Sequence, residues 1–183
     1  MDPHARLVAL LRERSFSLGD FVLASGRRSR YYIDCRRTTM HAEGLALIGT
    51  LGLAAIRDAG WAADAVGGLT LGADPVAYAI AAASAALPPA VHGFTVRKAA
   101  KQHGTGRRIE GCFEAGARVV VVEDVITTGG SALEAVAAVR AEGGIVLGVL
   151  AVVDRDEGGR EVIERDGHAV HALVHVRNLL ATA

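Results

Sequence analysis

Aromatic residues and cysteines are scarce in this chain of 183 residues: aromatics make up 4% of it, and the cysteines are Cys35 and Cys112. Two cysteines provide neither a disulfide framework nor the spacing of a zinc site, so we expect a reducing compartment. Glycine or a charged residue interrupts each apolar run well short of the roughly 20 residues that a membrane span requires. The charged N-terminal segment also lacks the apolar core of a signal peptide. We therefore expect a cytoplasmic protein with no membrane partner.

Net charge is absent too, because 20 basic side chains balance 20 acidic ones. A protein that binds nucleic acid over a broad surface needs a basic excess. We therefore expect no nucleic-acid partner, although the balance does not exclude a local basic patch. Alanine, valine, leucine and glycine dominate the composition, which suits helices packed closely on a parallel sheet. The length is that of one domain with a substantial core, and no repeat or linker divides residues 1–183.

The most informative segment lies at residues 118–131. Residues 119–122 are four valines with no polar position among them, which is typical of a central parallel strand covered by helices on both faces. Glu123 and Asp124 follow directly. A turn of small and hydroxyl-bearing residues, 127–131, then leads into a helical pattern. The sequence therefore predicts two carboxylates and a small-residue turn at the carboxyl end of a buried strand.

Ligands of open α/β sheets bind at that edge of the sheet. Glycines let the backbone close around an anion, and the N–H groups at a helix start favour a phosphate. Carboxylates repel a phosphate, so the two acids are better suited to ribose hydroxyls or to a divalent cation. We therefore predict a sugar phosphate as the ligand. An ordinary polar strand–turn–helix is the alternative. However, two adjacent acids at the end of a buried strand reduce stability, which is hard to explain unless they serve a function.

Hydrophobic periodicity and cap signals predict the surrounding elements. Asp2 with Pro3, and Asp74 with Pro75, are candidate N-cap and first-turn pairs. We expect helices at residues 3–14, 42–59 (closed by Gly60), 75–86, 132–142, 159–166 and 177–182. We expect strands at residues 65–67, 91–96, 119–122, 145–153 and 170–176, and a hairpin at residues 21–34.

Two connections between the predicted elements have an unusual composition. Glycine-rich backbone links a strand to a helix at residues 67–75, but it lacks the Gly-Lys-Ser/Thr of an ATPase phosphate loop, so triphosphate hydrolysis is not expected. Residues 97–111 combine cations with glycines and show no hydrophobic periodicity. A long basic loop in a compact domain is usually functional, although a solvated charged hairpin would have the same composition.

A second strand end is also charged, at Asp154, Arg155 and Asp156. An arginine there could bind a substrate carboxylate in bidentate fashion; the alternative is an arginine paired with its neighbouring acids. The remaining histidines show no metal spacing, and we interpret them as surface or packed residues; they include His41, His92, His168, His171 and His175.

Several of these segments resemble parts of one family. Residues 118–131, with four hydrophobics, two acids, two further residues and Thr-Thr-Gly-Gly-Ser, resemble the phosphoribosyl-diphosphate (PRPP) motif of type I phosphoribosyltransferases. Residues 97–104, which read Arg-Lys-Ala-Ala-Lys-Gln-His-Gly, are similar to the catalytic loop of orotate phosphoribosyltransferase. Residues 21–34 resemble the hood of that family, and residues 67–75 resemble its pyrophosphate loop. The resemblance covers almost the whole chain.

The resemblance implies the type I phosphoribosyltransferase fold: α/β, with a central, mostly parallel sheet flanked by helices and a small N-terminal hood formed largely by residues 1–40. It implies transfer of the 5-phosphoribosyl group from PRPP to orotate, which gives orotidine 5′-monophosphate and pyrophosphate in the synthesis of UMP. It also implies Mg²⁺, held mainly by PRPP oxygens and water without a dedicated protein metal site. A homodimer that shares the loop 97–111 between subunits is implied as well.

Site residues follow from their positions in these motifs. The implied catalytic residues are Lys101, His103 and Asp124. The implied orotate-binding residues are Thr127, Arg155 and Tyr32. The implied PRPP-binding residues are Thr70, Arg97, Lys98, Lys101, His103, Glu123, Asp124, Val125, Ile126, Thr127, Thr128, Gly129, Gly130 and Ser131. The chain departs from the family at Ala24 and Leu71, where relatives carry lysine, and at Ile33, where they carry a second aromatic residue; any stacking on the base therefore falls to Tyr32.

Two other functions would use the same central motif. One is a purine phosphoribosyltransferase, which the hood, the spacing of the basic loop and Arg155 disfavour because a purine has no carboxylate. The other is a regulator that keeps the PRPP site and binds nucleic acid. The zero net charge and the complete basic loop speak against that regulator.

Overall fold

The computed structural model describes residues 2–22, 26, 28–99 and 107–181, and it contains a six-stranded sheet and a separate two-stranded hairpin. The large sheet has the strand order β5-β4-β3-β6-β7-β8, with β6 next to its centre. Only β5 runs antiparallel to its neighbour. Its strands are β3 (Ala65–Leu69), β4 (His92–Val96), β5 (Ile109–Gly111), β6 (Arg118–Ile126), β7 (Ile145–Asp154) and β8 (Val170–His175).

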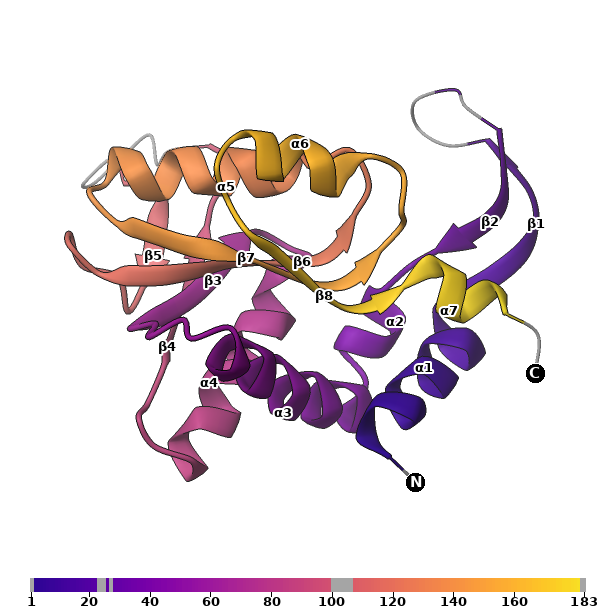
Figure 1. The fold of residues 1–183 in the computed structure, drawn as a ribbon, viewed down its shortest axis with the longest axis horizontal. Coiled ribbons are helices and arrows are strands. Elements are labelled where there is room, and N and C mark those ends of the chain that lie inside the picture. The colour runs from indigo at the N-terminus through magenta and orange to yellow at the C-terminus, as the bar shows by residue number, and fades with distance from the viewer. Residues whose placement is uncertain (1, 23–25, 27, 100–106, 182–183) are drawn as a thin grey trace.

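Helices cover both faces of this sheet (Figure 1). They are α1 (Pro3–Arg14), α2 (Arg36–Thr39), α3 (Ala42–Asp58), α4 (Ala73–Ala86), α5 (Gly130–Ala141), α6 (Gly159–Arg165) and α7 (Val176–Leu180). Val120 and Val122 of β6 belong to the core shared with α1, α3 and α4. Val119 and Val121 belong to the core shared with α5 and α6. The prediction of a strand buried on both faces is confirmed, and with it the α/β class.

Small residues let the layers approach closely. A Cβ atom added to Gly49 of α3 would lie 2.4 Å from the carbonyl oxygen of Ala79 in α4. A Cβ added to Gly68 of β3 would lie 2.1 Å from the carbonyl oxygen of Val122 in β6. Real Cβ atoms do not approach backbone this closely, so both contacts depend on glycine. The abundance of glycine and alanine in the sequence therefore reflects tight interlayer packing.

The hood is a hairpin of β1 (Phe16–Val22) and β2 (Arg28–Ile33), which pair antiparallel. It projects from the body beside α1 and α7 (Figure 1). Helix α1 begins as predicted, because the Asp2 carboxylate accepts a hydrogen bond of 2.9 Å from the backbone N–H of Ala5. The guanidinium of Arg12 in α1 donates to backbone carbonyls near the chain end, including that of Asn178. The N-terminal helix and the C-terminal helix thus form one support beneath the hood.

Most predicted elements are found within two residues of their expected bounds, and five features differ. The hairpin begins at Phe16, five residues before its predicted start at residue 21. The predicted cap at Asp74 is wrong: Gly72 occupies the N-cap of α4, and Asp74 binds two threonine hydroxyls instead. Residues 109–111, which were expected to be loop, form β5 along β4. Strand β6 continues through the acid pair to Ile126 instead of ending before it. Helix α2 was not predicted at all.

Candidate active site

The acid pair lies in the last part of β6, where it is enclosed by the sheet and its helices. Glu123 is only 6% exposed. Its Oε1 atom is buried and has no hydrogen-bond partner within the part of the chain that the structure describes. Burial, together with the neighbouring charge of Asp124, raises the pKa of Glu123 to about 8 from its ordinary value of 4.5. Glu123 is therefore mostly neutral at pH 7, when it can donate a hydrogen bond as well as accept one.

Asp124 is held differently. Its carboxylate accepts a hydrogen bond of 2.9 Å from the backbone N–H of Val125. Burial raises its pKa, and that hydrogen bond lowers it in part. A Cβ atom added to Gly72 would lie 2.6 Å from the Asp124 Oδ1 atom, so the turn before α4 fits closely against this carboxylate. The missing side chain of Gly72 is what leaves room for Asp124.

A cavity of about 280 Å³ opens in front of the acid pair. It brings together five residues of the predicted PRPP site, which are Thr70, Lys98, Glu123, Asp124 and Ser131. Arg36 of α2 also lines it, although no sequence pattern singled this residue out. Arg36 forms an ion pair of 2.8 Å with Asp34, and the hydrogen bond from Arg36 lowers the pKa of Asp34. The cavity therefore has acids on one strand and cations on two neighbouring segments.

The small-residue turn connects β6 to α5 next to this cavity. Gly129 has a φ of +82° and serves as the N-cap of α5, a conformation that other residues seldom adopt. A smaller hollow beside the turn is lined by Glu123, Thr127, Gly129 and Ser131, among others. The helix that follows has 12 residues, and its first N–H groups lack intrahelical partners. The turn has the composition and position of an anion-binding helix start.

A hydrogen-bonded cluster fixes the turn on the other side of the cavity. The Asp74 carboxylate accepts hydrogen bonds from the hydroxyl of Thr70, at 2.7 Å, and from that of Thr95, at 2.9 Å. The hydroxyls of Tyr78 and Thr95 lie 2.7 Å apart. Thr95 comes from β4 and is 21 residues from Asp74 in the sequence. This long-range contact explains why Asp74 is not available as a helix cap.

Arg155 follows β7 and is buried, with 7% of its side chain exposed. Its backbone N–H donates to the carbonyl of Ile126 at the end of β6, so it stands next to the small-residue turn. Its guanidinium carbon lies 4.9 Å from the centre of the Tyr31 ring. The Arg155 Nη2 atom and the Glu157 Oε1 atom are 2.8 Å apart, at an angle that does not make a hydrogen bond. Arg155 pairs with Glu157 rather than with the adjacent aspartates.

Tyr31 connects the hood to this arginine. Its hydroxyl donates to the Glu157 carboxylate over 2.9 Å, and its ring stacks on Phe16. Burial raises the pKa of Tyr31. The predicted base-binding residue Tyr32 is 43% exposed and packs against Phe21 instead. Successive residues of a strand point to opposite faces, so only one of the two tyrosines can face Arg155. Sequence reasoning singled out neither Tyr31 nor Glu157 for a place beside this arginine.

The basic loop is described only at its two ends. The backbone N–H of Arg97 donates to the carbonyl of Arg108, and the side chain of Arg97 lies 3.7 Å from Glu110. Lys98 is exposed and lines the cavity. Lys101, His103 and Ala24 lie outside the described residues, so their predicted roles stay predictions.

Within the described ranges, no helix combines the length and the apolar character that crossing a membrane requires. No protein-family model matches the chain. The chain is nevertheless 48% identical over 178 residues to orotate phosphoribosyltransferase of Aquifex aeolicus, with 96% of each chain covered. It is 48% identical over 179 residues to orotate phosphoribosyltransferase of Corynebacterium glutamicum, with coverage of 98% and 95%.

The fold agrees with these relatives. The crystal structure of Mycobacterium tuberculosis orotate phosphoribosyltransferase in complex with PRPP superposes with a TM-score of 0.83 at 42% identity, and the match covers 98% of this chain and 99% of that one. The parallel sheet, the hood and the cavity at the acid pair therefore stand in a type I phosphoribosyltransferase fold. The chain belongs to the orotate phosphoribosyltransferase family.

Proposed function

We propose that this protein transfers the 5-phosphoribosyl group of PRPP to orotate, which releases pyrophosphate and forms orotidine 5′-monophosphate in pyrimidine synthesis. The observation that carries the proposal is a juxtaposition. A cavity with two buried acids and a glycine-rich helix start lies beside a buried arginine that the hood covers. The first part suits a sugar phosphate, and the second suits a planar carboxylate.

We assign PRPP to the cavity in front of β6. The turn of residues 125–131 would bind the 5-phosphate through backbone N–H groups and hydroxyls, and Thr70 would contact the diphosphate from the opposite turn. Asp124 would accept hydrogen bonds from the ribose hydroxyls and favour positive charge on the ring as the C1–O bond breaks. Neutral Glu123 adds a hydrogen bond without adding negative charge next to the phosphates.

Pyrophosphate leaves with the electron pair of the C1–O bond, and a ring nitrogen of orotate, after it has lost its acidic proton to solvent, forms the new bond to C1. Negative charge therefore grows on the leaving group, and cations directed at it stabilise the transition state. We assign this role to Arg97, Lys98, Lys101 and His103. A flap formed by these residues would also exclude water, which would otherwise hydrolyse PRPP.

The donor set of the cavity fits Mg²⁺, because this ion prefers phosphate and water oxygens with few protein ligands. The described residues offer it the carboxylate of Asp124 and the neutral carboxyl group of Glu123, whose Oε1 atom has no hydrogen-bond partner among them. When bound, the ion would supply positive charge to the diphosphate. We propose no dedicated protein cage for it.

Orotate would bind between the hood and the PRPP turn. Arg155 is proposed to bind its carboxylate, Thr127 to bind the ring, and Tyr32 to provide an aromatic surface. Because Tyr31 and Glu157 contact each other and the arginine, we add them as residues that position the guanidinium. We further propose a cytoplasmic homodimer in which the loop 97–111 completes the neighbouring site, as family resemblance suggests.

The direct test is the loss of orotate absorbance when PRPP and Mg²⁺ are added to the purified protein. Activity with orotate and none with adenine or hypoxanthine is expected. A Lys101→Ala variant should keep its fold and lose turnover by orders of magnitude. Comparable activity with a purine would reject the assignment of the base, and near-normal turnover of Lys101→Ala would remove the basic loop from the mechanism.

A further inference from the structure

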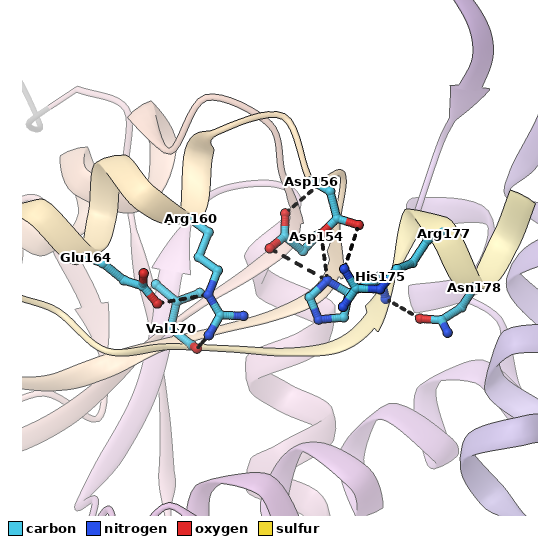
Figure 2. A network of polar contacts seen from close by, with 8 residues as sticks. All are labelled: Asp154, Asp156, Arg160, Glu164, Val170, His175, Arg177 and Asn178. Carbon is cyan, nitrogen blue, oxygen red and sulfur yellow. Dashed lines mark hydrogen bonds and ion pairs between the residues drawn. The ribbon is translucent and has the colours of Figure 1, made fainter.

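A second polar cluster lies at the same edge of the sheet, at the ends of β7 and β8 (Figure 2). Asp154 is the last residue of β7 and pairs in register with His175, the last residue of β8. Asp156 follows two residues after Asp154 and has a φ of +51°, which brings its side chain back towards His175. The sequence pattern did not place His175 at this charged strand end, because 19 residues separate it from Asp156.

The three side chains point towards a common point. The Nδ1 atom of His175 lies 2.8 Å from Asp156 Oδ1 and 4.0 Å from Asp154 Oδ2. The three atoms all lie within 4.8 Å of one another. Two ligands that each bind one ion at about 2.1 Å can be at most about 4.2 Å apart. Both histidine distances fall below that limit, and rotation of the exposed Asp156 side chain can bring the third oxygen in.

An independent observation shows that this cluster lacks a partner. Asp154 is 1% exposed. Its Oδ1 atom accepts a hydrogen bond of 2.9 Å from the backbone N–H of Asp156. Its Oδ2 atom is buried and has no hydrogen-bond partner among the described residues, and the imidazole nitrogen it faces is beyond hydrogen-bond distance. Leaving a buried carboxylate oxygen without a hydrogen-bond partner destabilises the folded state, so a bound cation would remove that penalty.

We propose that Asp154, Asp156 and His175 bind one divalent transition-metal ion, with Zn²⁺ as the best match and water in the remaining positions. One imidazole nitrogen and two carboxylate oxygens suit Zn²⁺, whereas Mg²⁺ and Ca²⁺ prefer oxygen ligands alone. The half-exposed side of the cluster provides an entry path. Arg177 lies 3.5 Å from the other oxygen of Asp156 and holds that carboxylate from outside.

The site differs from the proposed Mg²⁺ position in its ligands and in its place in the sheet. It lies at β7 and β8, and none of its residues lines the cavity in front of the acid pair. Because Arg155 stands between two of the ligands in the sequence, a bound ion would tie the turn that carries this arginine to β8. A metal ion at the ends of β7 and β8 would therefore help to fix the position of Arg155.

The test uses the full chain after treatment with EDTA, in buffer without PRPP, orotate or Mg²⁺. Titration calorimetry with Zn²⁺ should show one ion bound per chain, and thermal unfolding should occur at a higher temperature with Zn²⁺ present. The Asp156→Asn variant, whose changed residue is exposed, should bind at least about tenfold more weakly. The control is His171→Asn, which removes another histidine of β8 and should bind Zn²⁺ as the unchanged chain does.

Asp154→Asn and His175→Gln extend the series, with thermal unfolding as the check that they fold. Equal Zn²⁺ affinity in the unchanged chain and in Asp156→Asn would overturn the proposal, because binding would then occur elsewhere. Absence of Zn²⁺ heat would overturn it as well. Neither result would bear on the proposed transfer reaction, since the measurement contains no substrate.

Discussion

The acidic side chains at the two ends of strand β6 differ in their hydrogen bonding, and their pKa values shift in opposite directions. At the amino end, the exposed Arg118 donates three hydrogen bonds to Asp64, from its backbone N–H, its Nε and its Nη2. The pKa of Asp64 falls to about 2 as a result. At the carboxyl end, Glu123 is buried beside Asp124, one of its oxygens is unpaired, and its pKa rises to about 8. Only residues 119–122 lie between Arg118, whose partner Asp64 is fully hydrogen-bonded to it, and Glu123, which has an unpaired oxygen.

Cavity size alone would not have indicated this site, because the described residues form larger hollows elsewhere. One, of about 710 Å³, is lined by Phe113, Glu142 and Gly143, among others. Another, of about 510 Å³, lies near the amino end of β6 and is lined by Trp61, Arg57 and the Asp64–Arg118 pair, among others. Its charged groups are already bonded: Arg57, for example, donates to the backbone carbonyls of Leu87 and Pro89. The smaller cavity at the carboxyl end is lined by Glu123, which has a raised pKa and an oxygen without a hydrogen-bond partner. Buried groups with shifted pKa values therefore identify the site better than volume does.

The strongest test of this contrast is the pH dependence of stability. Between about pH 4.5 and pH 8, folded Glu123 keeps a proton that the unfolded chain releases, so the free energy of unfolding should fall as pH rises through this window and level off above it. This window of about 3.5 pH units corresponds to at most about 5 kcal/mol. Glu123→Gln should remove this slope in urea unfolding curves measured from pH 5 to pH 8.

The matched control for that slope is Asp64→Asn at the other end of the strand. Because its pKa is lowered, Asp64 contributes stability above its ordinary pKa of 3.8 and loses it only as pH falls towards about 2. This variant should keep the slope between pH 5 and pH 8. An equal slope in the unchanged chain and in Glu123→Gln would show that Glu123 is not the group responsible.

The next largest effect should be on catalysis. Asp124→Asn removes the charge assigned to the ribose and should lower kcat by about a hundredfold or more, while thermal unfolding changes little. Asp64→Asn changes the same atoms on a carboxylate outside the site and should leave kcat within about twofold, because exposed pairs contribute little. Similar losses in both variants would mean that the two ends of β6 are not functionally different.

A methyl group can test how closely the site is fitted. Gly72→Ala requires no change of backbone, since φ at this position is −64°. It would nevertheless place a carbon 2.6 Å from Asp124 Oδ1 and move that carboxylate. We expect kcat/KM for PRPP to fall about tenfold to a hundredfold, with an unchanged thermal midpoint. Unaltered kcat/KM would show that the position of Asp124 tolerates displacement.

The smallest effect concerns the positioning of Arg155. Tyr31→Phe removes one hydrogen bond to Glu157, so KM for orotate should rise about two- to tenfold while KM for PRPP stays the same. Tyr32→Phe keeps the exposed ring and serves as the control, with both KM values unchanged. The opposite ranking of the two variants would mean that the hydroxyl of Tyr32, and not that of Tyr31, acts on orotate.

The sequence was sufficient for the elements whose signals are local. Asp2 and Pro3 mark the start of α1, and the valines of β6 predict a strand buried on both faces; both predictions are confirmed. Short elements were missed because three or four residues cannot show a period: Ile109–Gly111 forms β5 and Arg36–Thr39 forms α2. Strand β1 was placed too late because five of its seven residues are exposed, which hides any alternation.

The site was predictable where residues are neighbours in the sequence and unpredictable where they are not. Glu123, Asp124 and the turn to Ser131 follow one another, so one motif identified them. Tyr31 reaches Glu157 across 126 positions, and His175 reaches Asp156 across 19. Contacts of that separation depend on the order of strands and on the placement of the hood, which periodicity does not give.

The bridge from Tyr31 to Arg155 has a consequence for exchanging parts between relatives. A chimera whose replacement hood has no tyrosine at position 31 would lose the phenol that holds Glu157, and the guanidinium would keep a buried charge with one partner fewer. A chimera that exchanges only the turn after β7 would leave the phenol without its acceptor. Base preference in this fold should therefore be transplantable only when both segments are moved together.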